Sequence, residues 1–136
     1  ETTMASTTNK TGRQVYNLAG IPQPAGYKSM AVRAGGLIFV SGQIGKGPDG
    51  LPLPTVEEQA AGAFRQIAAI LELAGSSLAN VVKLSILVTE AEYQFRLQDV
   101  KREFFPTDPP ATMGAVVKGL ALGAKVEIDA IATVDG

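Results

Sequence analysis

The sequence predicts an α+β domain in which two helices pack on one face of a β-sheet. Short runs of β-branched and aromatic residues are bounded by Gly and Pro, and two longer stretches carry apolar residues at helical spacing. Together these segments predict the order β-β-β-α-β-α-β-β. The chain has 136 residues and 46% hydrophobic content, which fits one domain. We expect residues 1–13, which are polar and Thr-rich, to be a flexible N-terminus and 14–136 to form the domain.

The first part of the predicted sheet is an edge strand followed by a hairpin. Gln14–Leu18 fits a short edge strand, and a Gly- and Pro-rich loop at 20–26 separates it from Tyr27–Arg33. A Gly-Gly turn then leads to Leu37–Gly42, so the last two runs predict a hairpin. The start of this second run is apolar at every position, whereas a strand with one face in water should alternate.

Each predicted helix begins with a capping pattern. Thr55 and Glu58 have the spacing of a capping box, and the apolar positions that follow continue to Gly75, a residue suited to a left-handed cap. Thr89 and Glu92 repeat the pattern before a second amphipathic stretch. Pro106 ends that stretch because proline cannot continue a helix.

The remaining strands predict that the sheet has an uncovered face. They lie at Val81–Val88, Thr112–Lys118 and Lys125–Thr133, with a turn near 119–123. Two helices cannot cover both faces of a sheet of this size, yet several strands are apolar on both faces. We therefore expect identical subunits to cover the second face.

Composition excludes several kinds of chemistry. The chain contains neither Cys nor His, which rules out zinc sites built from them, a cysteine nucleophile and a Ser-His-Asp triad. Any general acid–base catalysis must therefore use Asp, Glu, Lys, Tyr or bound water. The net charge of −1 provides no nucleic-acid footprint, and no apolar run approaches the roughly 20 residues of a membrane helix. We expect a cytoplasmic protein, because the N-terminal residues do not resemble a secretory signal.

Glu127 is the most informative single residue. In a strand, Val126 and Ile128 point to one face, which should meet the helices, while Glu127 points to the other. A solvated outer face is the simplest interpretation for a lone Glu in a strand. Here the same face also carries Ser85 and Leu87, which favours a half-buried carboxylate at the subunit contact. A carboxylate in such a place is suited to act as a general acid or base.

Other candidates are weaker. Ser41 and Gly42 end the apolar strand, where Ser offers a hydroxyl and Gly permits close approach of a backbone, although such residues also occur at ordinary strand ends. Tyr27 follows the Gly- and Pro-rich loop and fits either ligand contact or packing. Lys101 and Arg102 read as a pair on the solvated face of a helix.

Three segments together resemble the RidA/YjgF (Rid) family. Gly36–Ile44 resembles its first signature, and Gln59–Gly75, followed by Val81-Val82-Lys83, is similar to its middle. Pro110-Ala111 and then Lys125–Ala132 resemble its closing signature. The resemblance spans roughly residues 26–133, so 14–136 is expected to be a single Rid-type domain.

The resemblance implies a fold, an assembly and an activity. The fold would be chorismate-mutase-like, in a homotrimer whose sheets form a central barrel with clefts at the subunit boundaries. Archetypal members hydrolyse reactive imines and enamines to 2-oxo acids and ammonia, with neither a metal nor an organic cofactor. The partners expected here are therefore further copies of the chain and a small-molecule substrate, with no nucleic acid and no membrane.

One position departs from the family pattern. Archetypal closing signatures begin Pro-Ala-Arg, and that arginine holds the substrate carboxylate, whereas Thr112 stands there in this chain. Threonine cannot make a bidentate, charged contact, so the resemblance implies a divergent member whose substrate is not the usual carboxylate-bearing amino-acid imine. Glu127 matches the family glutamate that positions water, and Tyr27 lies close to the family's cleft tyrosine.

The leading hypothesis is a cofactor-independent hydrolase or deaminase acting on a small imine, enamine or related reactive metabolite in an intersubunit cleft. Glu127 would orient or deprotonate water, and Thr112, Ser41, Gly42 and Met113 would hold the substrate. The alternatives are a non-catalytic binding or regulatory trimer and a specialised lyase, isomerase or cyclase. RNA cleavage, attributed to some relatives, ranks low because the chain has no histidine and a slightly negative charge.

Overall fold

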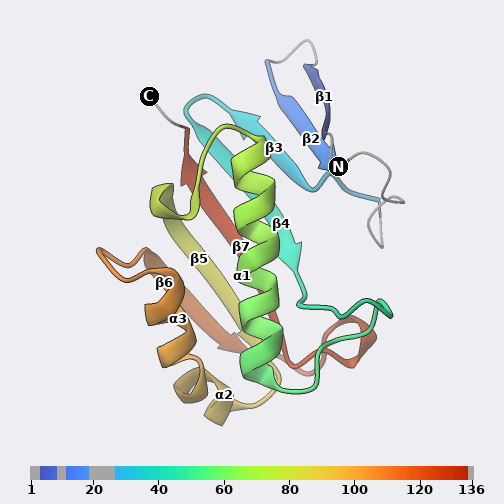
Figure 1. Ribbon diagram of the computed structural model, residues 1–136, viewed down its shortest axis with the longest axis vertical. Coiled ribbons are helices and arrows are strands. Elements are labelled where there is room, and N and C mark those ends of the chain that lie inside the picture. The colour runs from blue at the N-terminus through green and yellow to red at the C-terminus, as the bar shows by residue number, and fades with distance from the viewer. Residues whose placement is uncertain (1–3, 9–11, 19–26, 135–136) are drawn as a thin grey trace.

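A single mixed sheet carries all of the described strands, and the helices lie together on one of its faces (Figure 1). The computed structural model describes residues 4–8, 12–18 and 27–134. In chain order the elements are β1 Met4–Thr8, β2 Gln14–Leu18, β3 Ala31–Ala34, β4 Leu37–Gln43, α1 Val56–Leu73, the 3₁₀ turn η1 Leu78–Asn80, β5 Val81–Val88, α2 Ala91–Arg96, α3 Gln98–Phe104, β6 Ala111–Val116, the 3₁₀ turn η2 Ala121–Gly123 and β7 Val126–Thr133.

The last strand lies in the interior of the sheet. The seven strands are ordered β1-β2-β3-β4-β7-β5-β6, and only β5 and β6 pair in parallel. A parallel pair needs a crossover connection, which α2 and α3 supply. β7 is inserted between β4 and β5, so its side chains lie near the centre of both faces. The α+β class and the packing of helices on one face are confirmed.

The N-terminal strand was not predicted. β1 pairs antiparallel with β2, so Met4–Thr8, which falls within the segment expected to be flexible, extends the sheet. β2 is consequently an inner strand rather than the edge strand expected from sequence. A short Thr-rich run lacks the apolar alternation that marks a strand, which is why the sequence did not indicate it. The predicted loop at 20–26 lies outside the described residues.

Several element boundaries also differ from expectation. β3 begins at Ala31 rather than Tyr27, because the Met30 amide donates to the Asn17 side chain at 2.9 Å instead of to a strand carbonyl. The second helix is divided at Leu97 into α2 and α3. Its predicted capping box is wrong: Glu90 is the N-cap and its side chain makes no capping bond.

The first helix begins and ends as predicted. The Glu58 amide donates to the Thr55 hydroxyl at 3.1 Å, and that hydroxyl donates to the Glu58 carboxylate at 3.0 Å. The carboxylate therefore closes the cap through the hydroxyl rather than through the Thr55 amide. Gly75 follows the helix with φ +85°, a left-handed conformation that glycine adopts without strain.

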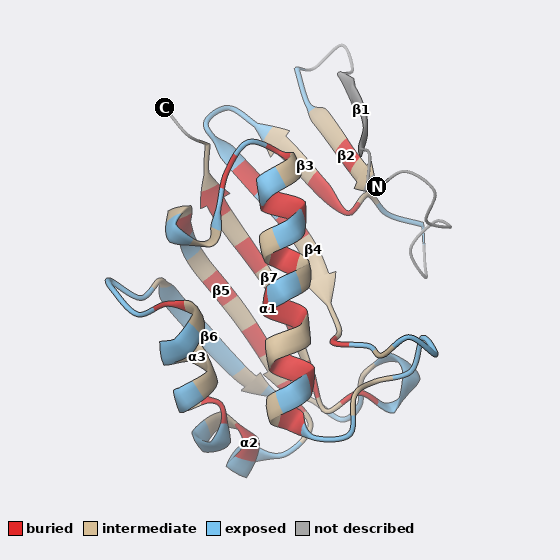
Figure 2. Ribbon diagram, in the orientation of Figure 1, coloured by how far each residue is buried: buried red, intermediate tan, exposed pale blue. Residues whose placement is uncertain are grey.

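The core lies between α1 and the sheet. Buried and partly buried residues alternate along β7, and the buried set faces the helix (Figure 2). Phe64 of α1 is fully buried, and its ring lies 5.2 Å from that of Phe104 and 5.3 Å from that of Phe105. These aromatic contacts join α1 to the end of α3, so both helices are held over the sheet as one layer.

Gln59 ties the helix to the start of β7. Its side chain is 2% exposed, its amide nitrogen donates to the Leu53 carbonyl at 2.7 Å and its amide oxygen accepts from the Lys125 backbone amide at 2.8 Å. Because the Lys125 amide is taken by Gln59, β7 begins at Val126, one residue later than predicted. This bridge anchors the strand that carries Glu127.

Replacing Gln59 by Leu should lower the free energy of unfolding by about 1–3 kcal/mol, because two partly buried backbone groups lose their partners. Urea unfolding monitored by circular dichroism measures the change. Gln66→Leu is the matched control, since the side chain of this half-exposed glutamine of the same helix makes no hydrogen bond within the described part of the chain. Equal effects of the two substitutions would contradict the bridging role.

An ion pair joins the start of α1 to the end of α2. Arg96 donates to the two Glu57 carboxylate oxygens at 2.9 and 2.7 Å, and both side chains are roughly two-fifths exposed. Hydrogen bonds from Arg96 lower the pKa of Glu57 below its ordinary value. A lowered pKa in the folded state means that the pair stabilises the fold above the unfolded pKa of the carboxyl. This contribution is lost as pH falls through the folded pKa.

Arg96→Gln should therefore lower Tm slightly at neutral pH, and the difference from wild type should shrink as pH falls through the lowered folded pKa of Glu57, below which the carboxyl is protonated in both proteins. Scanning calorimetry over a series of pH values from neutral into the acid range measures it. Arg65→Gln, an exposed cation of α1 without an ion pair among the described residues, should show no such dependence. A difference in Tm that stayed constant with pH would contradict the stabilising role of the Glu57–Arg96 ion pair.

Candidate functional site

Glu127 lies on the sheet face that no helix covers. It is half-buried, its strand neighbours Val126 and Ile128 are fully buried beneath α1, and Leu87 of β5 lies opposite it. Its carboxylate makes neither a hydrogen bond nor an ion pair with the described residues. The sequence-based expectation of a half-buried carboxylate on this face is matched by the structure.

The Glu127 carboxylate rests against the backbone of Gly42. A Cβ at position 42 would collide with the carboxylate oxygen, so only glycine permits this approach. The pairing of β4 with β7 shifts register between Val40 and Gln43, next to this contact. An irregularity of this kind re-aims the strand and leaves backbone groups unpaired, which is common beside functional sites.

Ser41 lies beside this contact, and its hydroxyl is already committed as a donor. The hydroxyl donates to the Ser29 carbonyl at 2.6 Å, and the Ser41 amide donates to the Met30 carbonyl at 2.9 Å. The oxygen of the hydroxyl retains its capacity to accept a hydrogen bond. Ser41, Gly42 and Glu127 thus form one group, which we call the carboxylate half-site.

Thr112 lies on the opposite face of the sheet. β6 pairs in register with β5, so Thr112 and Gly114 share the face of the buried residues Leu84 and Ile86. The Thr112 hydroxyl donates to the Pro110 carbonyl at 3.1 Å. A sheet therefore separates Thr112 from the carboxylate half-site within one chain.

A hollow of about 400 Å³ lies between Thr112 and the helices above it. Its lining comes from β5, β6, α2 and α3: Ile86, Gln94, Phe95, Leu97, Gln98, Lys101, Thr112 and Gly114. A second hollow of about 520 Å³ continues toward the proline-rich loop after α3, and the two share Gln98, Lys101 and Thr112. We call these two spaces the helix-side cleft.

The other two predicted site residues lie apart from both groups. Met113 is on the open face, in register with Ser85 and through it with Asp129, and about half of its surface is exposed. Two strand spacings, roughly 10 Å, separate it from β7. Tyr27 is fully exposed and borders the part of the chain that the structure does not describe.

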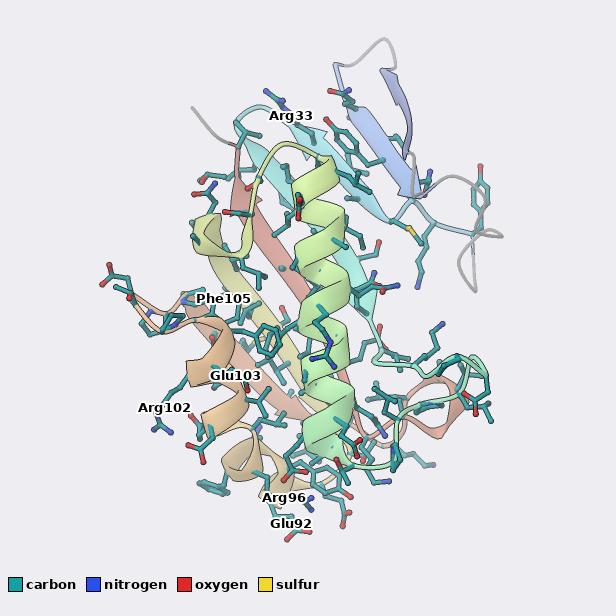
Figure 3. The ribbon with its side chains drawn as sticks, viewed as in Figure 1. Arg33, Glu92, Arg96, Arg102, Glu103 and Phe105 are labelled. Carbon is teal, nitrogen blue, oxygen red and sulfur yellow. The ribbon has the colours of Figure 1, made fainter. Side chains whose placement is uncertain are left out.

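Sequence reasoning missed the polar residues that the helices contribute to the cleft. Lys101 was expected on a solvated face with Arg102, but Lys101 is half-buried and lines both hollows. Arg102 is exposed as expected, pairs with Asp99 at 2.8 Å and extends outward from α3 (Figure 3), although it also borders the larger hollow. Gln94, Gln98 and Lys101 are spaced four and three residues apart, so they share one helical face, and that spacing was the available signal.

These observations define a class of protein: a small α+β domain with a carboxylate on an open sheet face and a polar cleft under its short helices. Within residues 4–8, 12–18 and 27–134, no group of three or more Asp and Glu side chains is placed to hold a metal ion. No helix among the residues described is long and apolar enough to cross a membrane.

Comparison with known proteins identifies the family. Residues 20–134 match the family model described as Endoribonuclease L-PSP. A RutC family protein of Aquifex aeolicus is 37% identical over 114 residues, which are 82% of this chain and 91% of that protein. A 2-iminobutanoate/2-iminopropanoate deaminase of Bos taurus is 35% identical over 122 residues, 88% of this chain and 89% of that protein.

A solved structure agrees with the sequence relatives. RidA from the Antarctic bacterium Psychrobacter sp. PAMC 21119 superposes with a TM-score of 0.79 at 32% identity, covering 83% of this chain and 93% of that one. The chain therefore belongs to the RidA/YjgF family, as the sequence resemblance indicated.

Gly42→Ala should displace the Glu127 carboxylate and lower the free energy of unfolding by about 1 kcal/mol, the low end of overpacking effects, because the flexible end of a half-buried side chain can move aside. The cost should largely disappear in the Glu127→Ala background, and a double-mutant cycle of urea unfolding measures the coupling. Gly36→Ala is the control, because a Cβ there meets open space. Additive effects of the Gly42 and Glu127 substitutions would show that the contact does not exist.

Proposed function

We propose that this protein is a cofactor-independent hydrolase of small imines and enamines, acting in a cleft shared between copies of the chain. The observation that carries the proposal is Glu127, a half-buried carboxylate without a partner among the described residues, packed against the backbone of Gly42. Membership of a family whose relatives include 2-iminobutanoate/2-iminopropanoate deaminases supports the same chemistry.

The reaction needs one group that exchanges protons with water. Glu127 accepts a proton from a water molecule while the water oxygen forms a bond to the imine carbon, and the imine nitrogen takes up a proton. The carbon–nitrogen bond of the resulting aminol then breaks, ammonia leaves, and the hydroxyl loses its proton to form the carbonyl. An enamine enters the same path after protonation on carbon. Water and imine yield a carbonyl compound and ammonia, with no redox change.

The arrangement of the two half-sites favours a shared cleft. The carboxylate half-site faces away from the helices, whereas the helix-side cleft opens under α2 and α3 on the other face. A substrate contacts both only when the open face of one copy meets the cleft edge of another. Leu37 and Phe39 of β4 are 36% and 42% exposed on the open face, which suits burial by further copies. We propose the homotrimeric barrel that the family resemblance implies.

The roles of the remaining residues follow from their hydrogen bonds. Ser41 and Thr112 already donate their hydroxyl protons to the carbonyls of Ser29 and Pro110, so each is left to accept from an N–H of the substrate. The backbone around Gly42 adds polar groups close to Glu127. Recognition at position 112 therefore differs from a bidentate arginine contact.

Glu127→Gln should reduce ammonia release from freshly generated imines by at least about 100-fold, because general acid–base catalysis typically contributes that much. The control is Asp129→Asn, which removes the neighbouring carboxylate on the same sheet face. A Glu127 variant with unchanged kcat would remove this residue from the mechanism.

The same proteins should also be incubated with RNA, since the family description contains ribonuclease activity. We expect no cleavage that depends on Glu127. RNA cleavage lost in Glu127→Gln, without any turnover of imines, would replace the proposed function.

A further inference from the structure

We propose that Lys101 is the anion-binding, specificity-determining residue of the helix-side cleft. This inference rests on the proposed function and adds a residue to the same site. The sequence-based expectation of a substrate without the usual carboxylate depended on position 112 alone, where threonine replaces arginine. The structure places a different cation beside that position.

Lys101 occupies the junction of the cleft. It lines the hollow of about 400 Å³ and the hollow of about 520 Å³, and in both it is accompanied by Gln98 and Thr112. No Asp or Glu is among the residues that line either hollow. The Lys101 side chain is therefore half-buried beside a hollow whose lining carries no acidic residue, where a charge–charge contact with a ligand is screened less than on the open surface.

The charges on α2 and α3 distinguish Lys101 from its neighbours. Arg96 is bound to Glu57 by two hydrogen bonds, and Arg102 is paired with Asp99. The Lys101 side chain makes neither an ion pair nor a hydrogen bond with any described residue. Lys101 is therefore the cation on these two helices that lines both hollows, and within the described chain no carboxylate pairs with its charge.

The two glutamines complete a polar wall next to Lys101. Gln98 donates to the Gln94 carbonyl at 2.8 Å, which holds it along the helix. Gln94 lies over Gly114 of β6, where a Cβ would come within 3.0 Å of its side-chain nitrogen. Gln94 and Gln98 thus line the space in front of Thr112 without adding charge, so Lys101 sets the electrostatic preference of the smaller hollow.

A lysine contact differs physically from an arginine contact. The ammonium is a point charge on a flexible stem with three donors, so it binds one carboxylate oxygen without fixing the plane of the group. Hydrogen bonds to charged groups commonly change affinity by roughly ten- to hundredfold. We therefore expect Lys101 to select anionic imines, with its effect mainly on KM.

The test compares two substrates of equal size: 2-iminopropanoate, which carries a carboxylate, and its neutral amide, both generated immediately before the assay. Lys101→Gln should lower kcat/KM for the anionic imine by about ten- to hundredfold and leave the neutral imine unchanged. Lys101→Arg should restore most of the loss. Arg65→Gln, which removes an exposed cation of α1 that lines neither hollow, should affect neither substrate.

Failure of this inference and failure of the proposed function have different signatures. Equal loss on both substrates, or no loss on either, in Lys101→Gln overturns the anion-binding role, while Glu127 dependence of both would leave the hydrolase proposal intact. Absence of any turnover by the wild type overturns the hydrolase proposal. In that case pyruvate titrated by NMR is the probe for Lys101: weaker binding in Lys101→Gln than in Arg65→Gln supports the site, and equal binding overturns it.

Subunit mixing tests whether the cleft is shared. Co-expression of Glu127→Gln and Lys101→Gln chains with different affinity tags yields mixed oligomers, in which some clefts combine intact Glu127 from one copy with intact Lys101 from another. Their activity on the anionic imine should exceed the mean of the two parent variants. Mixed oligomers with no such gain would show that no cleft combines the two residues from different copies, and would overturn the shared cleft.

Discussion

Side-chain alternation along β7 is the constraint on which the rest of the structure depends. Val126 and Ile128 pack beneath α1, so Glu127 between them must face the other way. A slip of one residue would place the carboxylate in the core and the apolar residues in water. The hydrogen bond from the Lys125 amide to Gln59 fixes where β7 begins and therefore stabilises this register.

The same alternation divides the candidate site between the two faces of the sheet. Parallel pairing with β5 turns Thr112 toward the helices, while β7 turns Glu127 away from them. The proposed acid–base group and the proposed substrate-binding cleft can therefore contact the same substrate only at a boundary between two copies of the chain. Under this proposal a single contact between copies has two consequences. It buries the exposed apolar residues of β4, such as Phe39, and it brings Glu127 of one copy to the cleft of another.

Charge in the cleft depends on which cations already have partners. Arg96 and Arg102 are held by nearby carboxylates, and exposed pairs of this kind contribute little to stability. Lys101 is half-buried and has no such contact within the described chain. With the neutral Thr112 on β6, the positive charge of the smaller hollow lies on Lys101 of the facing helix.

The sequence by itself determined the α+β class, the Thr55 cap, the end of the first helix and the face on which Glu127 lies, because all of these follow from local periodicity and capping. It did not reveal β1, because this strand pairs with β2 but has no alternating apolar pattern in its sequence. Nor did it place Lys101, since helical spacing tells which residues share a face but not what that face meets. Only the tertiary structure decided that Thr112 and Glu127 lie on opposite faces. Their placement depends on how β6 and β7 each pair with β5, and the sequence of a single strand does not specify such long-range register.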